Sequence, residues 1–425
     1  CEQCGAWNSL IEEAVPAATT VGIKRRTATA LTPTTLAAVE ATRHTRLATG
    51  LNEVDQVLGG GIVPGSVTLL SGDPGIGKST LVLQLAAQVA ANHPVLYVSG
   101  EESAAQIKLR ADRLGVNATH LQLLTDSNVD AIAATIEQSN YHLVIIDSIQ
   151  TMATEALTGS PGTVGQITAS AQLLTAIAKQ HSTALLIIGH VTKEGAIAGP
   201  KILEHLVDVV LYLEGERYGA FKALRGIKNR FGSTSEVGIF EMSETGLSPV
   251  ANPSEALLAE RQPGPGSVVF AAIEGTRPLL VEVQALVAPT AFGYPKRTAV
   301  GFDLNRLNLL IAVLSKRARL NLSSSDVYVN VVGGLRISEP AADLAIILSI
   351  ASAFKDAPIP QSLVAFGEVG LSGEVRSVSQ AARRVAEAKR LGYTNAIGPA
   401  HGHAPGQTGV RDVLQVVELM GKSTK

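Results

Sequence analysis

The chain of 425 residues is too long for a single compact core, and this length predicts two or three domains. Hydrophobic residues make up 46% of the chain and charged residues 17%, a composition that excludes a disordered protein. The formal net charge of −2 excludes a polycation, so any contact with nucleic acid needs a local basic surface. The apolar runs are only as long as strands, no signal peptide is visible, and two cysteines cannot build a disulfide framework. We therefore expect a cytoplasmic protein without a membrane span.

The chain opens with a C-x-x-C pair, Cys1 and Cys4, followed by Gly5. One such pair supplies two thiolates, whereas a structural zinc ion needs four ligands. The sequence holds no other cysteine, so either a first pair was lost upstream by truncation or these are two free thiols. We favour truncation, because glycine after the second cysteine is typical of a zinc knuckle. We expect residues 1–17 to be a partial zinc knuckle and residues 18–48, rich in Ala, Thr and Pro, to be a linker.

Short apolar runs alternate with helical stretches from residue 49 onward. Continuous apolar runs bounded by polar residues or glycine are typical of strands buried on both faces. These runs are 67–70, 95–98, 143–146, 184–188 and 209–213, with a helical stretch at 164–180 among them. We therefore expect residues 49–251 to form an open, mostly parallel α/β sheet.

The octapeptide 72–79, GDPGIGKS, fits the phosphate-binding pattern G-x-x-x-x-G-K-[ST]. It lies between an expected strand and an expected helix, which directs backbone N–H groups and the positive end of a helix dipole at one place. Lys78 would reach the β- and γ-phosphates, and the Ser79 hydroxyl would hold Mg²⁺. We predict that this chain binds a nucleoside triphosphate through Gly72, Asp73, Pro74, Gly75, Ile76, Gly77, Lys78, Ser79 and Thr80.

Three acidic or basic positions at the ends of expected strands would complete the phosphate site. Asp147 ends an apolar run, and we expect it to be the second Mg²⁺ anchor. Glu101 is the candidate catalytic base; its neighbour Glu102 is the rival, and both acids could simply favour the start of the next helix. His190 would sense the γ-phosphate or serve as an ordinary polar residue at a strand end, and its position leaves both interpretations open.

The pentapeptide 228–232 places two cations around an asparagine on a turn closed by glycine. Such a turn suits a phosphate or transition-state clamp, although spacing alone favours an ordinary solvated turn. Its residues are Lys228, Asn229, Arg230, Phe231 and Gly232.

A second break falls at residues 252–266, which read as a linker with a short helix at 255–261. Beyond it we expect an α+β domain, residues 267–425, with its own core. Its half-exposed strands are expected at 268–272, 279–287 and 327–332, and its helices at 304–318, 341–354 and 379–391.

Taken together, these motifs resemble those of the bacterial DNA-repair ATPases of the RadA (Sms) family. The resemblance covers essentially the whole chain. It rests on the cysteine pair with Gly5, Trp7 and Asn8, on the octapeptide, and on segments 49–51, 58–66 and 99–103. It also rests on the pentapeptide, which is the family's KNRFG motif. It implies that residues 49–251 are a RecA-like ATPase domain that behaves like hexameric DnaB-type helicases. In such rings nucleotide lies between subunits, so Lys228 and Arg230 would reach the γ-phosphate of a neighbour.

The resemblance also implies cofactors and partners: ATP and Mg²⁺, Zn²⁺ in the full-length protein, single-stranded and branched DNA, and the RecA recombinase. The family moves along single-stranded DNA and drives branch migration. Two glycine-containing loops, 154–165 and 192–201, would line the ring channel, although neither carries an aromatic residue for base stacking.

Residues 267–425 resemble the proteolytic domain of Lon, which makes an ATP-dependent protease the main alternative; a RecA-like ATPase that remodels proteins is another. Lon-type proteolysis needs a serine activated by a lysine. Here Ala341 stands in the place of the serine, and segment 379–384 brings arginines but no lysine. We therefore expect a proteolytically inactive domain used for assembly and DNA contact. Six basic residues would face phosphate or form an ordinary solvated face: Lys296, Arg297, Arg306, Lys316, Arg317 and Arg319.

Overall fold

The structure is a computed structural model, and it describes residues 45–116, 118–190, 200–215, 221–291, 293–402 and 404–422. The chain divides into two units, Cys1–Arg43 and His44–Lys425, and the described residues belong to the second. The expected half zinc site and most of the expected linker lie outside the described residues, as does most of the loop 192–201.

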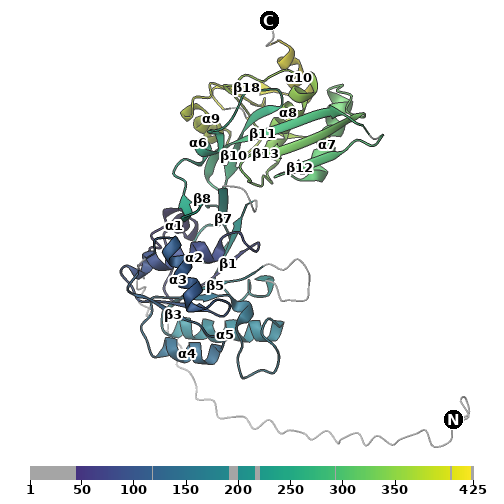
Figure 1. Cartoon of the computed structure of the whole chain (residues 1–425). Coiled ribbons are helices and arrows are strands. Elements are labelled where there is room, and N and C mark those ends of the chain that lie inside the picture. The colour runs from purple at the N-terminus through teal and green to yellow at the C-terminus, as the bar shows by residue number, and fades with distance from the viewer. Residues whose placement is uncertain are drawn as a thin grey trace, which may run out of the picture. The chain divides into compact units, whose positions relative to one another are not determined.

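A nine-stranded sheet forms the first part of the described chain, with the strand order β3-β2-β4-β5-β1-β6-β7-β8-β9 (Figure 1). Neighbouring strands from β3 to β6 in this order run parallel, and β7, β8 and β9 continue the sheet antiparallel. The mixed α/β fold with a mostly parallel sheet is thus confirmed. The strands are β1 Val67–Gly72, β2 Val95–Ser99, β3 Leu121–Leu124, β4 Leu143–Asp147, β5 Ala184–Ile188, β6 Val209–Glu214, β7 Phe221–Asn229, β8 Val237–Ser243 and β9 Gly246–Pro249.

The parallel strands contribute side chains to two apolar cores, one on each face of the sheet, because successive side chains of a strand point to opposite faces. In β1, Leu70 packs into one core, whereas Val67 and Leu69 pack into the other. This double burial explains why the strands read as continuous apolar runs. The first core includes α1 and α2, and the second includes α4 and α5, which lie side by side (Figure 1).

The helices around this sheet are α1 Asn52–Leu58, α2 Lys78–Ala90, α3 Ala104–Arg113, α4 Val129–Glu137 and α5 Val164–Gln180, with short 3₁₀ turns at Ile149–Thr151 and Pro200–Ile202. Side chains cap two of these α-helices. Ser103 forms a capping box at the start of α3, and the side chain of Asn128 accepts hydrogen bonds from two backbone N–H groups at the start of α4. None of the described helices is both long and apolar enough to span a membrane.

A seven-stranded sheet in the order β12-β13-β11-β10-β14-β17-β18 forms the C-terminal region, which we define as residues 253–422. Most residues of its apolar core lie within this region, and Ala223, Val237 and Ile239 of β7 and β8 also belong to this core. Its strands are β10 Ser267–Glu274, β11 Arg277–Pro289, β12 Arg297–Val300, β13 Ser325–Val331, β14 Leu363–Ala365, β17 Asn395–Pro399 and β18 Gln407–Val410, beside a small hairpin of β15 Glu368–Val369 and β16 Val375–Arg376. Its helices are α6 Pro253–Leu258, α7 Leu304–Arg317, α8 Asp343–Lys355, α9 Ala381–Arg390 and α10 Val413–Lys422, with a 3₁₀ turn at Pro340–Ala342.

Three details of the C-terminal region differ from the sequence expectation, and one is that residues 279–283 of β11 are all buried rather than half-exposed. The strand β10 is buried along its first six residues rather than half-exposed, because it lies between β11 and β14 and both α8 and α9 contact it. The short helix expected at 255–261 begins and ends earlier, at Pro253–Leu258, because the side chain of Asn252 caps its first turn and proline occupies the first helical position. Alternating burial does hold for β13.

Candidate nucleotide-binding site

The octapeptide 72–79 forms the turn between β1 and α2, at the edge where the parallel strands end. Gly72 has φ 152°, and a Cβ there would overlap the carbonyl oxygen of Leu213 on the neighbouring strand. Gly77 precedes α2 with φ 112° and no side chain caps the helix. The first N–H groups of a helix lack partners within it, so this uncapped end is suited to an anion such as phosphate.

Lys78, the first residue of α2, is 3% exposed and reaches back across the turn. Its Nζ donates to the carbonyl oxygens of Gly72 at 2.8 Å and Asp73 at 2.9 Å. Burial lowers the pKa of Lys78, against the opposing charges of Asp147, Asp73 and Glu101. The ammonium group is therefore held at the mouth of the turn, where phosphate oxygens would replace the carbonyl oxygens as acceptors.

Asp147 ends β4, next to the end of β2, and is 7% exposed. Its Oδ2 accepts a hydrogen bond of 2.5 Å from the hydroxyl of Tyr97, a fully buried residue of β2. No group of three or more His, Cys, Asp or Glu side chains that could hold a metal ion occurs among the described residues. Mg²⁺ bound with a nucleotide needs only one or two protein ligands besides phosphate and water, and one carboxylate with the hydroxyl of Ser79 fits that requirement.

Glu101 and Glu102 follow β2, and the structure gives them different partners. Glu101 Oε1 accepts a hydrogen bond of 2.6 Å from the hydroxyl of Ser148, and Nε2 of His190 lies 3.7 Å from the same oxygen. Glu102 instead forms an ion pair with Arg110 of α3. The side chain of Glu101 is 47% exposed, so its carboxylate remains open to a water molecule.

His190 follows β5, so Glu101, Asp147 and His190 come from the ends of three neighbouring strands. Burial and the charge of Lys78 lower the pKa of His190, although Glu101 and Asp147 oppose the shift. The imidazole is therefore neutral at neutral pH.

The pentapeptide 228–232 lies at the opposite edge of the sheet. Lys228 and Asn229 pair with Val210 and Val209, at the start of β6, whereas Gly72 pairs with Leu213 near its end. Four strand residues span roughly 13 Å at about 3.3 Å each. The structure therefore does not bring the pentapeptide to the phosphate-binding turn of its own chain.

The two cations of the pentapeptide have different surroundings. Nζ of Lys228 donates to the carbonyl oxygens of Glu204 at 2.6 Å and Val207 at 2.7 Å. Arg230 contacts Oδ1 of Asp208 at 3.0 Å, and its side chain is 54% exposed. Lys228 thus ties the turn to segment 204–207 by hydrogen bonds, whereas the side chain of Arg230 is more than half exposed to solvent.

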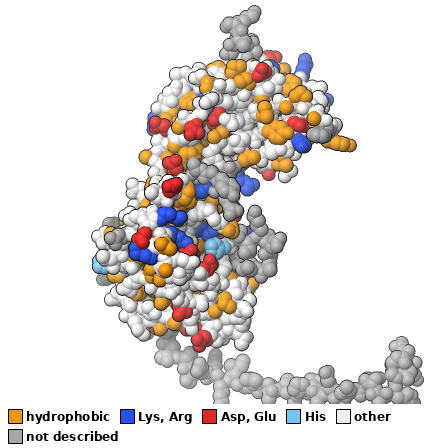
Figure 2. Space-filling view, in the orientation of Figure 1, with side chains coloured by type: hydrophobic (Ala, Val, Ile, Leu, Met, Phe, Trp, Pro, Cys, Tyr) orange, Lys and Arg blue, Asp and Glu red, His pale blue; other side chains and the backbone are white. Residues whose placement is uncertain are grey.

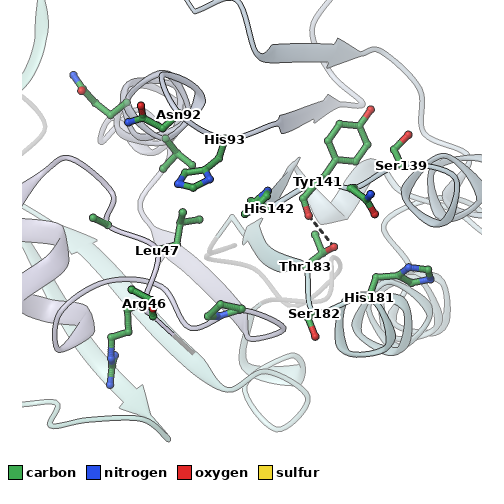
Figure 3. A pocket seen from close by; sticks show the side chains of 16 residues that line it. Arg46, Leu47, Asn92, His93, Ser139, Tyr141, His142, His181, Ser182 and Thr183 are labelled. Carbon is green, nitrogen blue, oxygen red and sulfur yellow. Dashed lines mark hydrogen bonds between the residues drawn. The ribbon is translucent and has the colours of Figure 1, made fainter. Parts of the chain in front are cut away.

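A separate hollow with a volume of about 680 Å³ lies where β2, β4 and β5 begin, at the edge opposite the octapeptide (Figure 3). The rings of His93 and His142 face each other there with centroids 4.6 Å apart. Burial and the neighbouring His93 lower the pKa of His142. None of the described residues that line this hollow belongs to the octapeptide, so it is not the phosphate site.

Comparison with known proteins matches residues 32–196 to the family described as "AAA domain" and residues 296–402 to the family "Subunit ChlI of Mg-chelatase". The chain is 50% identical over 405 residues to "DNA repair protein RadA" of Bacillus subtilis, which covers 94% of this chain and 88% of the relative. It is 49% identical to the protein of the same name from Halalkalibacterium halodurans, which covers 100% of this chain and 93% of the relative. The chain belongs to the RadA family. Among solved structures, the crystal structure of the RadB recombinase matches 48% of this chain and 99% of its own, with 25% identity and a TM-score of 0.39.

In this RadA-family chain, the place where a Lon-type dyad is expected holds an ion pair whose arginine is buried. Ala341 lies in a 3₁₀ turn. The two carboxylate oxygens of the nearby Glu339 accept hydrogen bonds from the two terminal nitrogens of Arg384, at 3.1 and 2.7 Å. Arg384 is fully buried and also donates to the carbonyl oxygens of Ala271 and Ser379. A guanidinium used in this way is a structural element rather than a base.

Some of the basic side chains that we expected to face phosphate on the C-terminal region are bound to other groups of the same chain. Arg306 forms an ion pair with the buried Asp343, and Arg297 donates to the carbonyl oxygens of Leu322 and Ser325. On the face shown in Figure 2, the basic side chains of this region are scattered among apolar and acidic ones. These two arginines are therefore engaged within the fold rather than available to a phosphate backbone.

Sequence reasoning missed two residues that contact the candidate site, Tyr97 and Ser148. The available signal for Tyr97 was a hydroxyl within an apolar strand, because a buried tyrosine hydroxyl usually has a partner. Ser148 follows Asp147 directly, and nothing in the sequence indicates that it contacts a residue 47 positions away.

Proposed function

We propose that this chain is an ATP-dependent DNA motor of DNA repair and recombination, with a RecA-like core, which acts on single-stranded and branched DNA and promotes branch migration. The observation that carries the ATPase part is the gathering of Lys78, Asp147, Glu101 and His190 around one phosphate-binding turn. Membership of a family whose relatives are named DNA repair proteins supports the DNA part. The helicase activity and the RecA recombinase as a partner come from the family resemblance.

In this proposal the octapeptide and Lys78 bind the β- and γ-phosphates of ATP, while the hydroxyl of Ser79 and the carboxylate of Asp147 hold Mg²⁺. The metal ion supplies charge neutralisation of the phosphates when it is bound. Glu101 accepts the proton of the attacking water, a role that its open carboxylate and its fixed Oε1 suit better than the paired Glu102. The neutral His190, whose Nε2 lies 3.7 Å from Oε1 of Glu101, would sense the γ-phosphate by a hydrogen bond to one of its oxygens.

We further propose that Arg230 acts on the nucleotide of a neighbouring subunit, in a ring that is hexameric by resemblance. The separation of roughly 13 Å along β6 removes Arg230 from its own phosphate site. Its exposed side chain would exchange Asp208 for a phosphate oxygen of the neighbour, where it stabilises the charge of the transferring group. Lys228, whose ammonium group is bound to two carbonyl oxygens, is the weaker candidate and orients the turn.

For the C-terminal region we propose a Lon-like but proteolytically inactive scaffold that serves assembly and DNA contact. The buried Arg384, paired with the partly exposed Glu339 near Ala341, supports this assignment over an ATP-dependent protease, because alanine has no nucleophilic side chain and arginine cannot lose its proton to act as the base. The Zn²⁺ site of Cys1 and Cys4 stays a prediction.

The test is the rate of ATP hydrolysis with and without single-stranded DNA, measured across a salt series. A DNA motor predicts stimulation by DNA that weakens as salt rises, because backbone contacts release counterions. Equal rates with and without DNA at every salt concentration, together with hydrolysis stimulated by an unfolded protein substrate, would favour the protein-remodelling alternative.

A further inference from the structure

The hydroxyl of Tyr97 lies behind the phosphate site, within the apolar run 95–98 of β2. Tyr97 is 0% exposed in β2, where its neighbours along the strand are Leu96 and Val98. Its hydroxyl donates to Oδ2 of Asp147 at 2.5 Å. A buried tyrosine hydroxyl usually has a hydrogen-bond partner, and here the partner is the carboxylate to which we assign Mg²⁺.

The donor and the acceptor are both fixed. β2 and β4 are paired in register, with Val98 opposite Ile146 and Ser99 opposite Asp147, so both side chains stand on rigid neighbouring strands. The phenol of tyrosine keeps its proton at neutral pH, so its hydroxyl remains a donor to this carboxylate. A hydrogen bond from a neutral hydroxyl to a carboxylate is charge-assisted and short.

We propose that Tyr97 is a positioning residue for the metal site, because its hydrogen bond holds Oδ2 of Asp147 and keeps the second carboxylate oxygen available to Mg²⁺. This inference rests on the proposed nucleotide site. Without the hydroxyl, the carboxylate is free to rotate about its last bond and must be ordered again each time Mg²⁺ binds. Residues that orient metal ligands in this way typically contribute about 10- to 100-fold to metal affinity.

A second hydroxyl provides a matched comparison. Ser148 is fully buried and donates to Glu101, the other carboxylate of the site. Tyr97 and Ser148 therefore contact carboxylates with different assigned roles. Removing the Tyr97 hydroxyl should change the dependence on Mg²⁺, whereas removing the Ser148 hydroxyl should change the rate of hydrolysis.

The experiment measures binding of a fluorescent ATP analogue to the full chain, first in EDTA and then during titration with Mg²⁺, in the wild type, Tyr97→Phe and Ser148→Ala. We expect Tyr97→Phe to bind the analogue normally in EDTA and to need about tenfold more Mg²⁺ for half of the Mg²⁺-dependent change. Ser148→Ala should keep the wild-type Mg²⁺ midpoint. Circular dichroism verifies the fold, and Tyr97→Leu, which matches the aliphatic neighbours, replaces Tyr97→Phe if the latter does not fold.

Two further variants separate the possible failures. Asp147→Asn should raise the Mg²⁺ midpoint, and Tyr97→Phe added to it should raise it no further, because both changes act through one carboxylate. Independent effects of the two changes would overturn the positioning role, as would an unchanged midpoint in Tyr97→Phe beside a raised one in Asp147→Asn. A wild-type protein whose nucleotide binding ignores Mg²⁺ would instead overturn the proposed metal site itself.

Discussion

The edge of the first sheet that carries the octapeptide 72–79, here called the phosphate edge, and the Glu339–Arg384 cluster of the C-terminal region both contain a buried cation, but the two cations have different partners. At the phosphate edge, Lys78 binds only backbone carbonyl oxygens, and Glu101 is about half exposed. In the C-terminal cluster, Arg384 is enclosed by Glu339 and two carbonyl oxygens. Charged groups left available to a ligand mark a functional site, whereas an ion pair with its partners complete marks a structural one.

We expect the largest effect on activity from Lys78→Ala, at the phosphate edge. It removes the cation at the phosphate-binding turn, so we expect ATP hydrolysis to fall by on the order of a thousandfold. Steady-state ATPase assays measure the loss, and circular dichroism shows that the fold survives. Near-normal turnover would place the nucleotide site elsewhere.

Arg384→Leu tests whether the Glu339–Arg384 cluster serves the stability of the fold. It leaves the carboxylate of Glu339 without its cation, so we expect the free energy of unfolding to drop by about 3–5 kcal/mol in urea titrations. Adding Glu339→Gln should recover part of the loss, because the unpaired charge is then gone. Full stability of Arg384→Leu with a loss of ATP hydrolysis would make the cluster functional.

Glu101→Gln and Glu102→Gln form a matched pair one residue apart. We expect Glu101→Gln to bind ATP but to hydrolyse it about a hundredfold more slowly, because only water activation is lost. Glu102→Gln should lose only its ion pair with Arg110 and stay within a few-fold of the wild type. The reverse ranking in single-turnover assays would assign the base to Glu102.

The smallest expected effect comes from His190, whose pKa is lowered by burial and by Lys78. As pH falls through the ordinary histidine value of about 6.5, the unfolded chain takes up a proton before the folded chain does, so stability falls. His190→Gln removes this contribution. Urea midpoints measured between about pH 7.5 and 5.5 should therefore drop more in the wild type than in the variant, and equal slopes would contradict the shift.

How far the sequence predicts these features depends on the distance between the residues involved. The parallel strands were predictable because burial on both faces leaves continuous apolar runs, and the phosphate-binding turn was predictable because its chemistry lies within eight consecutive residues. The different partners of Glu101 and Glu102 were not predictable, since Ser148 lies 47 positions from Glu101. The same holds for Arg384 and Glu339, which are 45 positions apart. Burial of β10 was missed although residues 268–273 form a continuous apolar run, which by the same rule predicts burial on both faces.

We propose that Arg230 of one chain completes the nucleotide site of another. The most direct test mixes subunits that carry Arg230→Ala with subunits that carry Glu101→Gln, each nearly inactive alone. Mixed assemblies contain some interfaces with both residues intact, so our account predicts that part of the DNA-stimulated ATPase returns and varies with the mixing ratio. No recovery at any ratio, with co-assembly demonstrated by pull-down of differently tagged subunits, would contradict a shared site.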